Sequence, residues 1–390
     1  MREGWTYKTF GEVFDLQMGR TPDRKNPSLF GGDNIWVSIR DIDGKYIDGS
    51  KEHITNEAVV KSGIKLVKKG TVIMSFKLTV GKCAIARKDL YTNEAIMAFN
   101  VNKDFLLDSS FLYYYLQDYQ WSGTNKAVMG LTLNKATISK QKIAIPPLAE
   151  QERIVAELDL LSRIIDKKKA QLKELDQLAQ SIFYDMFGDP ITNEKGWEVK
   201  SLGGFCEIKG RIGFRGYTKN DFVSNSNEGA ISLSPTNIVN GSMDYSKCSY
   251  VTWDKYFESP EIMIQNGDIL LVKTGSSYGK CSLVRQLPHE ATINPQFVVI
   301  KDIKQNNIYI TFVLSSDYAK HQYDRFVLGT AIPTFSQKSL SSLPIPLPPL
   351  PLQPEFASKI EAIERQKSLI QQSIVETQTL FDSRMEHWFN

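Results

Sequence analysis

The chain has 390 residues and the composition of an ordinary globular protein, with 42% hydrophobic residues, 23% charged residues and a formal net charge of +3. Its length allows more than one hydrophobic core. No apolar run approaches the roughly 20 residues of a membrane-spanning helix, and the N-terminal residues lack the apolar segment of a secretory signal. These features predict a cytoplasmic chain without membrane segments.

The first globular part is expected at residues 1–148 and mixes short strands with helices. It carries 21 basic and 15 acidic residues, a net charge of +6, which is compatible with contact to nucleic acid. Residues 70–83 have the pattern of a strand, a polar loop and a second strand. A helix is expected at Ser110–Tyr119.

A long helix is predicted to follow at residues 149–188. Its seam positions alternate by four and three residues, the spacing of a coiled coil with apolar a and d positions. No proline or glycine interrupts the seam, and about 35 residues give roughly 50 Å of helix. The seam residues are Ile154, Leu158, Leu161, Ile165, Lys168, Leu172, Leu175, Ala179, Ile182 and Met186.

The second half of the chain repeats this order. A globular part at residues 189–350 has 16 basic and 15 acidic residues, and its segment 267–281 again has the pattern of strand, polar loop and strand. A helix is expected at Ile308–His321, and a second long helix at residues 351–390. The seam residues of that long helix are Phe356, Ile360, Ile363, Lys367, Ile370, Ile374, Thr377, Phe381, Arg384 and Trp388.

The two halves align at a constant offset of about 202 residues across the start of each long helix. Residues 145–151 read Ile-Pro-Pro-Leu-Ala-Glu-Gln, and residues 347–353 read Leu-Pro-Pro-Leu-Pro-Leu-Gln. At that offset the ten seam positions of one helix fall on the ten of the other. The pattern predicts an α+β protein with an internal repeat, in which two mixed α/β domains alternate with two long helices.

Connectivity predicts the direction of the helices. The first helix leaves the first domain and arrives at the second, so the second helix must run back to lie along it. We expect an antiparallel two-helix coiled coil with a pseudo-twofold axis, and a chain end near the chain start. Lys168 and Lys367 are polar seam positions that either fix the register or extend to solvent. The alternative is two separate amphipathic helices, each packed on its own domain.

Several motifs then resemble one family, the specificity (S) subunits of type I restriction-modification systems. They are Gly19-Arg20-Thr21-Pro22 followed by Ile35-Trp36-Val37, Gly267–Leu270 leading to Gly279-Lys280, Phe187–Pro190, and above all the proline-to-Glu-Gln helix start at residues 145–154. The resemblance covers the whole chain. The second half departs from it, with Gly210-Arg211-Ile212-Gly213 in place of Gly-Arg-Thr-Pro, and Leu352-Gln353-Pro354-Glu355 at the helix start.

This resemblance implies a non-catalytic, sequence-specific DNA-recognition subunit. Residues 1–148 and 189–350 would be target-recognition domains, and residues 149–188 and 351–390 spacer helices. The subunit would read an asymmetric bipartite site on double-stranded DNA and position two methyltransferase (modification) subunits, with restriction subunits (motor and nuclease) able to join. S-adenosylmethionine, ATP and magnesium would belong to those partners, so no cofactor is expected in this chain.

The expected DNA-contacting residues lie on the glycine-bearing polar loops, where a common scaffold carries different residues in each half. The alternative for these loops is ordinary sequence drift. A second pair of such loops, 128–132 and 327–333, precedes the proline stretches. The candidates are Arg20, Thr21, Arg24, Lys25, Lys77, Thr79, Arg211, Arg215, Lys273, Thr274, Ser276, Ser277 and Tyr278.

Signals for chemistry within the chain are weak. Asn294-Pro295-Gln296-Phe297 resembles the Asn-Pro-Pro-Tyr/Phe motif of amino-methyltransferases but lacks the second proline. Residues 275–280 are one residue short of a phosphate-binding loop, with Cys281 in place of its Ser/Thr. The four cysteines lack metal-ligand spacing and are expected to be reduced. Two rival hypotheses remain, a coiled-coil scaffold without a DNA role and a stand-alone adenine DNA methyltransferase.

Overall fold

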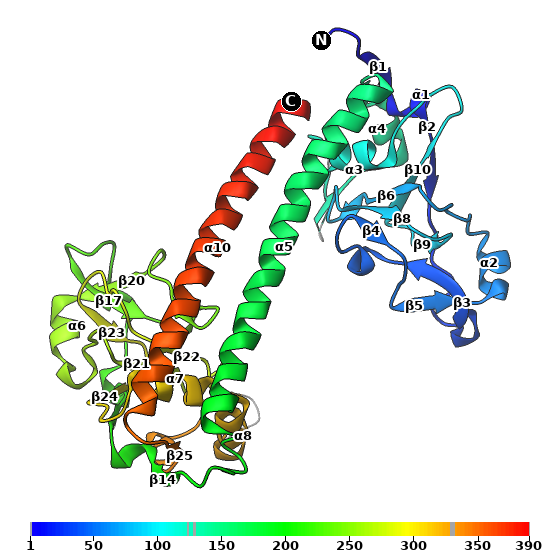
Figure 1. The fold of residues 1–390 in the computed structure, drawn as a ribbon. Helices are drawn as coiled ribbons and strands as arrows, with labels where there is room; N and C mark the ends of the chain where they lie inside the picture. The colour runs from blue at the N-terminus through cyan, green and yellow to red at the C-terminus, as the bar shows by residue number, and fades with distance from the viewer. Residues whose placement is uncertain (1, 123–124, 128–129, 328–331, 390) are drawn as a thin grey trace. The chain divides into compact units, whose positions relative to one another are not determined.

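The computed structural model describes residues 2–122, 125–127, 130–327 and 332–389. The chain divides into two compact units. Unit 1 comprises Met1–Ala170 with Gln371–Asn390, and unit 2 comprises Gln171–Ile370. Each unit contains an α/β body and one half of each long helix (Figure 1). The two mixed α/β domains expected from the sequence are confirmed.

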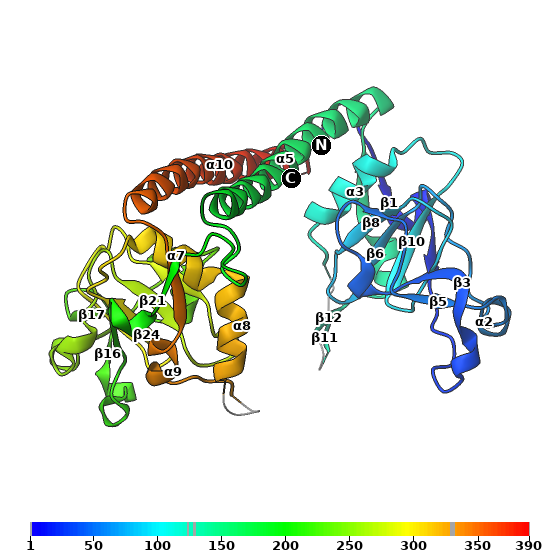
Figure 2. The same cartoon turned by 60° about the horizontal axis from the view of Figure 1, so that its bottom comes forward.

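Unit 1 is built on a central five-stranded sheet in the order β2-β10-β6-β8-β4. Strands β6 and β8 are buried along their whole length, which explains why their residues are apolar apart from the buried Ser75. The central strands are β2 (Phe14–Met18), β4 (Tyr46–Ile47), β6 (Val72–Ser75), β8 (Cys83–Ala86) and β10 (Ile96–Val101). Helix α3 (Ser109–Asp118) packs on β6 and β8 (Figure 2).

Three smaller sheets complete unit 1: β1-β13, β5-β3-β9 and β11-β12-β7. Their strands are β1 (Thr6–Thr9), β3 (Phe30–Val37), β5 (Glu52–Ile54), β7 (Lys77–Leu78), β9 (Tyr91–Thr92), β11 (Asn125–Ala127), β12 (Gly130–Thr132) and β13 (Lys142–Ile145). The short helices are α1 (Phe10–Val13), α2 (Asn56–Ser62) and α4 (Lys135–Lys140), with 3₁₀ turns η1 (Pro27–Leu29) and η2 (Ile39–Asp41).

Unit 2 holds two four-stranded sheets, β15-β24-β21-β22 and β16-β20-β17-β23, and two ribbons, β14-β25 and β18-β19. The strands are β14 (Glu198–Ser201), β15 (Glu207–Lys209), β16 (Phe222–Val223), β17 (Gly229–Leu233), β18 (Ile238–Val239), β19 (Ser242–Met243), β20 (Ser249–Thr252), β21 (Ile269–Val272), β22 (Cys281–Leu283), β23 (Ala291–Ile293), β24 (Phe297–Lys301) and β25 (Pro344–Leu347).

The helices of unit 2 differ from the prediction at one point. The helix expected at Ile308–His321 is two helices, α7 (Asn307–Ser315) and α8 (Asp317–Phe326). Ser316 separates them because its backbone is extended and its hydroxyl donates to the Val313 carbonyl at 2.6 Å. The remaining short helices are α6 (Trp253–Phe257) and α9 (Gln337–Ser341), with 3₁₀ turns η3 (Leu202–Gly204), η4 (Gly213–Arg215), η5 (Lys219–Asp221), η6 (Pro235–Asn237) and η7 (Pro260–Ile262).

The two long helices are α5 (Leu148–Phe187) and α10 (Leu352–Phe389), and they pack together in antiparallel directions. In unit 1 the α10 residue Trp388 donates to Glu157 of α5 at 3.1 Å. In unit 2 the Lys367 ammonium group lies 2.5 Å from Asp176. None of the twenty predicted seam residues is exposed, so the seam is confirmed and the alternative of two separately packed helices is wrong.

The polar seam residue Lys168 is hydrogen-bonded across the helix pair. Its ammonium group donates to the Ser373 hydroxyl at 2.5 Å and to the Thr377 hydroxyl at 3.0 Å. At the end of α10, the Trp388 carbonyl accepts from the Arg2 guanidinium at 2.8 Å. The chain end therefore lies beside the chain start, as expected from connectivity.

Candidate nucleic-acid interface

The predicted loops of each unit are joined by one turn that occurs in both. The Asn93 side-chain carbonyl accepts from Ala95 N–H at 3.1 Å, and that of Asn294 accepts from Gln296 N–H at 3.0 Å. These side-chain turns are typical of asparagine. Residues 294–297 resemble a methyltransferase motif, but in this structure the Asn294 side chain has a structural role, because it accepts a hydrogen bond from the backbone two residues later.

In unit 1 this turn holds two of the predicted segments. The Phe76 N–H donates to the Ala95 carbonyl at 3.0 Å, which fixes the loop that carries Lys77 and Thr79. The Arg20 N–H donates to Thr92 O at 2.9 Å. The Thr21 hydroxyl donates to the Glu94 carboxylate. The Gly-Arg-Thr-Pro segment and the Lys77 loop are thus brought together around residues 92–95.

In unit 2 the equivalent turn holds the equivalent segments. The Lys273 N–H donates to the Gln296 carbonyl at 2.8 Å. The Arg211 side chain donates to the Ile293 carbonyl at 3.2 Å. The segment that follows the first strand of the sheet (β2 or β15) and the loop between two later strands (β6–β8 or β21–β22) therefore meet at the same place in both units, although their residues differ.

The second pair of predicted loops pairs with the first. In unit 1 β7 pairs with β12, with Lys77 opposite Thr132. In unit 2 Thr274 forms an isolated antiparallel bridge with Thr334. Residues 128–129 and 328–331 of these loops lie outside the described residues. In each unit, two loops distant in sequence are thus joined by backbone pairing at one edge.

Arg24 is exposed but engaged. Its guanidinium forms two hydrogen bonds with Glu52, at 2.7 and 3.0 Å, and lies 4.8 Å from the ring centroids of Phe30 and Trp36. The hydrogen bond from Arg24 lowers the pKa of the Glu52 carboxyl. Arg40, which the sequence analysis missed, binds the same carboxylate at 2.7 Å.

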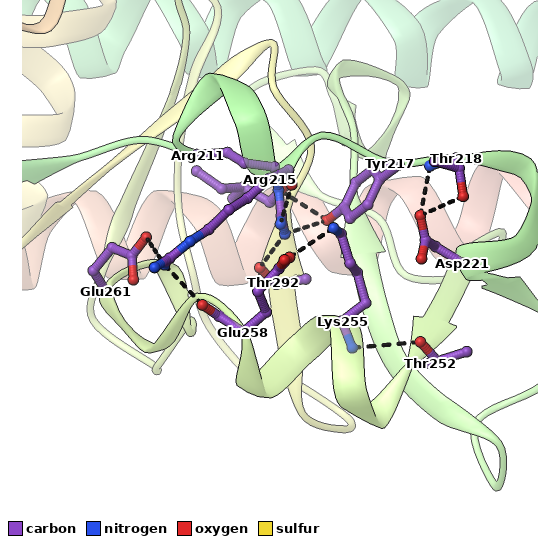
Figure 3. Close-up of polar contacts among 11 residues, drawn as sticks. Arg211, Arg215, Tyr217, Thr218, Asp221, Thr252, Lys255, Glu258, Glu261 and Thr292 are labelled. Carbon is purple, nitrogen blue, oxygen red and sulfur yellow. Dashed lines mark hydrogen bonds and ion pairs between the residues drawn. The ribbon is translucent and has the colours of Figure 1, made fainter.

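Arg211 is 6% exposed and lies in a network of neutral acceptors (Figure 3). Its Nη2 donates to the Tyr217 hydroxyl at 2.6 Å and to the Thr292 hydroxyl at 3.1 Å, and its Nη1 donates to the Arg215 carbonyl at 3.1 Å. The Arg215 side chain extends away from this network, to Glu261 at 3.6 Å and to the Glu258 carbonyl at 2.8 Å. Arg211 therefore anchors the 211–217 segment to β23.

The remaining unit 2 candidates lie on the β21–β22 loop. The Thr274 hydroxyl is 2.8 Å from that of Thr334, and Tyr278 donates to Asp324 at 2.7 Å, which raises the pKa of Tyr278. Ser276 is exposed and Ser277 half-buried. A strand follows this loop, so it lacks the helix N-terminus that a phosphate-binding loop uses.

Three lysines are the most available cations among the candidates. Lys25 is exposed and Lys77 half-buried. Lys273 is half-buried, and burial lowers its pKa. Within the described ranges, no hydrogen bond or ion pair is present at the Lys273 ammonium group. A partly desolvated cation without a partner is suited to an anionic ligand.

Other kinds of site are not indicated. Across the described residues, no three His, Cys, Asp or Glu side chains are grouped as metal ligands. In the same part of the chain, no helix has the length and apolar character to span a membrane. Cys83 and Cys281 are buried free thiols, and burial raises their pKa values, as expected for structural cysteines.

Comparison with known proteins gives one consistent family. Residues 2–177 and 194–378 each match the family model described as "Type I restriction modification DNA specificity domain". The MjaIX type I specificity subunit of Methanocaldococcus jannaschii is 28% identical over 227 residues, which are 53% of this chain and 52% of that protein. The chain thus spans about half the length of that relative.

Two further relatives match most of the chain. The EcoKI type I specificity subunit of Escherichia coli K12 is 21% identical over 382 residues, 93% of this chain and 82% of that protein. The crystal structure of a type I restriction-modification S subunit from M. genitalium has a TM-score of 0.55 at 14% identity, over 99% of this chain and 96% of that one. The likeness in structure extends to the whole fold.

Proposed function

Because the chain belongs to the type I restriction modification DNA specificity family, we propose that each of its two units reads one half of a bipartite DNA site. It is a DNA specificity subunit of a type I restriction-modification system, and within such a system this component is not catalytic. The resemblance in its sequence is thereby confirmed. We place its action in the cytoplasm.

One observation carries this proposal. The same backbone scaffold occurs in both units, with Phe76 bonded to Ala95 in one and Lys273 bonded to Gln296 in the other, but the side chains on the two scaffolds differ. Sequence is read by side chains at base edges. Because the two units have the same backbone scaffold but different side chains, they are suited to two different half-sites. The DNA target is then asymmetric.

The predicted residues divide into two proposed roles. Side chains on the loops are proposed to contact DNA: Arg20, Thr21, Lys25, Lys77, Thr79, Lys273, Thr274, Ser276 and Ser277. Arg24, Arg211, Arg215 and Tyr278 are proposed to position these loops through their bonds to protein groups. Arg20, Thr21 and Thr274 also bond to protein groups, to Ser62, Glu94 and Thr334, and are proposed to contact DNA from these fixed positions. Contacts to phosphates would set the register and contacts to bases the specificity.

The long helices are proposed to act as the spacer, with residues 1–148 and 189–350 as reading domains and 149–188 and 351–390 as spacer helices. Two modification subunits would dock on this framework and methylate one adenine in each half-site, and restriction subunits would join them. S-adenosylmethionine, ATP and magnesium would be bound by those partners.

An insertion experiment tests the spacer. One heptad inserted into both α5 and α10, placed symmetrically, keeps the seam in phase and adds about 10 Å, or about three base pairs. Methylation-sensitive genome sequencing of a host carrying the variant and its modification subunit should show unchanged half-sites and a gap altered by about two to four base pairs. A folded, assembled variant that methylates the original motif would exclude the helices as the spacer.

A further inference from the structure

Leu78 is an exposed apolar residue at the tip of a predicted reading loop. It is 52% exposed, and among the described residues its side chain joins none of the hydrophobic clusters. The Thr79 N–H donates to the Lys77 carbonyl at 2.8 Å, so Leu78 is the central residue of a three-residue turn. Packing within the protein does not account for a leucine here.

The backbone at Leu78 is in the left-handed region, with φ 65°. A leucine is sterically disfavoured there, whereas glycine is not. The equivalent residue of unit 2 is Gly275, with φ 100°. The two loops share their anchoring bonds: Ser75 and Val272 N–H groups each donate at 2.9 Å, to Lys82 and Lys280 carbonyls. The left-handed backbone at this position is therefore adopted by a glycine without steric cost in unit 2 and by a strained leucine in unit 1.

A strained residue that the protein core does not use points to a role in binding. Leu78 lies on β7, the edge strand of the ribbon β11-β12-β7, opposite Leu131 in the register. A β-ribbon fits the major groove of DNA, where the one apolar group on a base edge is the thymine 5-methyl. Lys77 precedes Leu78 on the same strand and is available to a phosphate.

We propose that Leu78 contacts a thymine methyl group in the half-site read by unit 1. This inference rests on the proposed function and deepens it by naming one specificity-determining residue and the chemical group that it recognises. Unit 2 has no side chain at the equivalent Gly275, so its half-site lacks this contact.

The test uses the chain in complex with its modification subunits and duplexes carrying the motif that the complex methylates. Each thymine of both half-sites is replaced, one at a time, by uracil, which pairs alike but lacks the methyl group. For the native chain, one uracil in the unit 1 half-site should weaken binding about fourfold, which is the loss of affinity expected when one buried methyl group is removed. Leu78→Ala should bind the thymine duplex more weakly and be insensitive to that uracil.

Controls separate the possible outcomes. Uracil in the unit 2 half-site should affect the native chain and Leu78→Ala equally. Leu78→Gly should unfold at or above the native temperature, because it removes the strained φ; a clear fall would show that Leu78 supports the fold and would overturn the proposal. If uracil weakened binding equally in the native chain and in Leu78→Ala, the thymine methyl group would not be the partner of Leu78, as when Leu78 is a wedge inserted between bases. This result would also overturn the proposal. Absence of any sequence-specific binding by the native complex would overturn the proposed function itself.

Discussion

The Gln151 side chain accepts a hydrogen bond from the backbone N–H of Asp108 at 2.8 Å. Asp108 is the N-cap of α3, and the Gln151 amide also donates to the Pro146 carbonyl at 2.9 Å. Gln353 repeats both bonds, with Asn306 at 2.9 Å and Pro348 at 3.0 Å. The glutamine of each proline-rich helix start therefore ties the long helix to the N-terminus of the helix that covers the sheet.

Replacement of this glutamine should destabilise its unit. Gln151 is fully buried, and its amide donates to the Leu106 carbonyl at 3.0 Å as well. Gln151→Ala therefore removes the partner of one backbone N–H and of two carbonyls and should cost about 2–3 kcal/mol. Gln353→Ala should cost a similar amount. Gln378→Ala, at an exposed position of α10, should stay within about 0.5 kcal/mol of the native chain. Urea denaturation measures the loss, and hydrogen exchange at α3 locates it; equal stability of Gln151→Ala and Gln378→Ala would refute this role.

The features that could be predicted from the sequence are those that depend on local pattern. The seam, the start of each long helix and the repeated loops follow from spacing alone. The break between α7 and α8 at Ser316 was not predicted, because the apolar pattern continues across it while Ser316 forms the N-cap of a new helix. Arg211 was predicted as a DNA contact at the place where the first half has Gly-Arg-Thr-Pro, yet its partners Thr292 and Ile293 are about 80 residues away in sequence and could not be foreseen.

Acid should weaken the packing of α10 on α5 in unit 1. The hydrogen bond from Arg384 lowers the pKa of Glu157 from its ordinary 4.5. A carboxyl with a lowered pKa stabilises the fold above its unfolded-state pKa, and this stabilisation is lost as the pH falls through the folded-state pKa. Glu157→Gln should therefore unfold below the native temperature near pH 7, and the difference should shrink below about pH 4.5. Thermal unfolding from pH 3 to 7 measures it, with the exposed Glu152→Gln as control; a difference that does not vary with pH would contradict the ion pair.

Lys273 should contribute to the affinity for DNA and not to the stability of the fold. Lys273→Met keeps the length of the side chain and removes a half-buried, unpaired charge, so stability should be unchanged or slightly raised. In the complex with modification subunits, the variant should bind DNA more weakly and reduce the slope of log K against log salt by about one. Lys304→Met, at an exposed position, is the matched control. If the slope of log K against log salt were unchanged in Lys273→Met, Lys273 would not contact a phosphate.

The isolated chain should bind DNA poorly. Its second globular part, residues 189–350, carries 16 basic and 15 acidic residues, and salt-dependent affinity scales with the number of phosphates that are neutralised. Addition of the modification subunit should tighten specific binding and steepen its salt dependence. Titration of labelled duplex with and without that subunit, at several salt concentrations, decides this; equal specific affinity in both cases would contradict it.

The two units are expected to read DNA independently of each other, and exchange of one unit tests this expectation most directly. Met385 and Trp388 of α10 belong to the hydrophobic core of unit 1, so residues 1–170 and 371–390 should be exchanged together for those of another family member. Methylation-sensitive sequencing of a host carrying this hybrid with its modification subunit should show one half-site replaced and the other unchanged. A folded hybrid that alters both half-sites, or neither, would contradict the account.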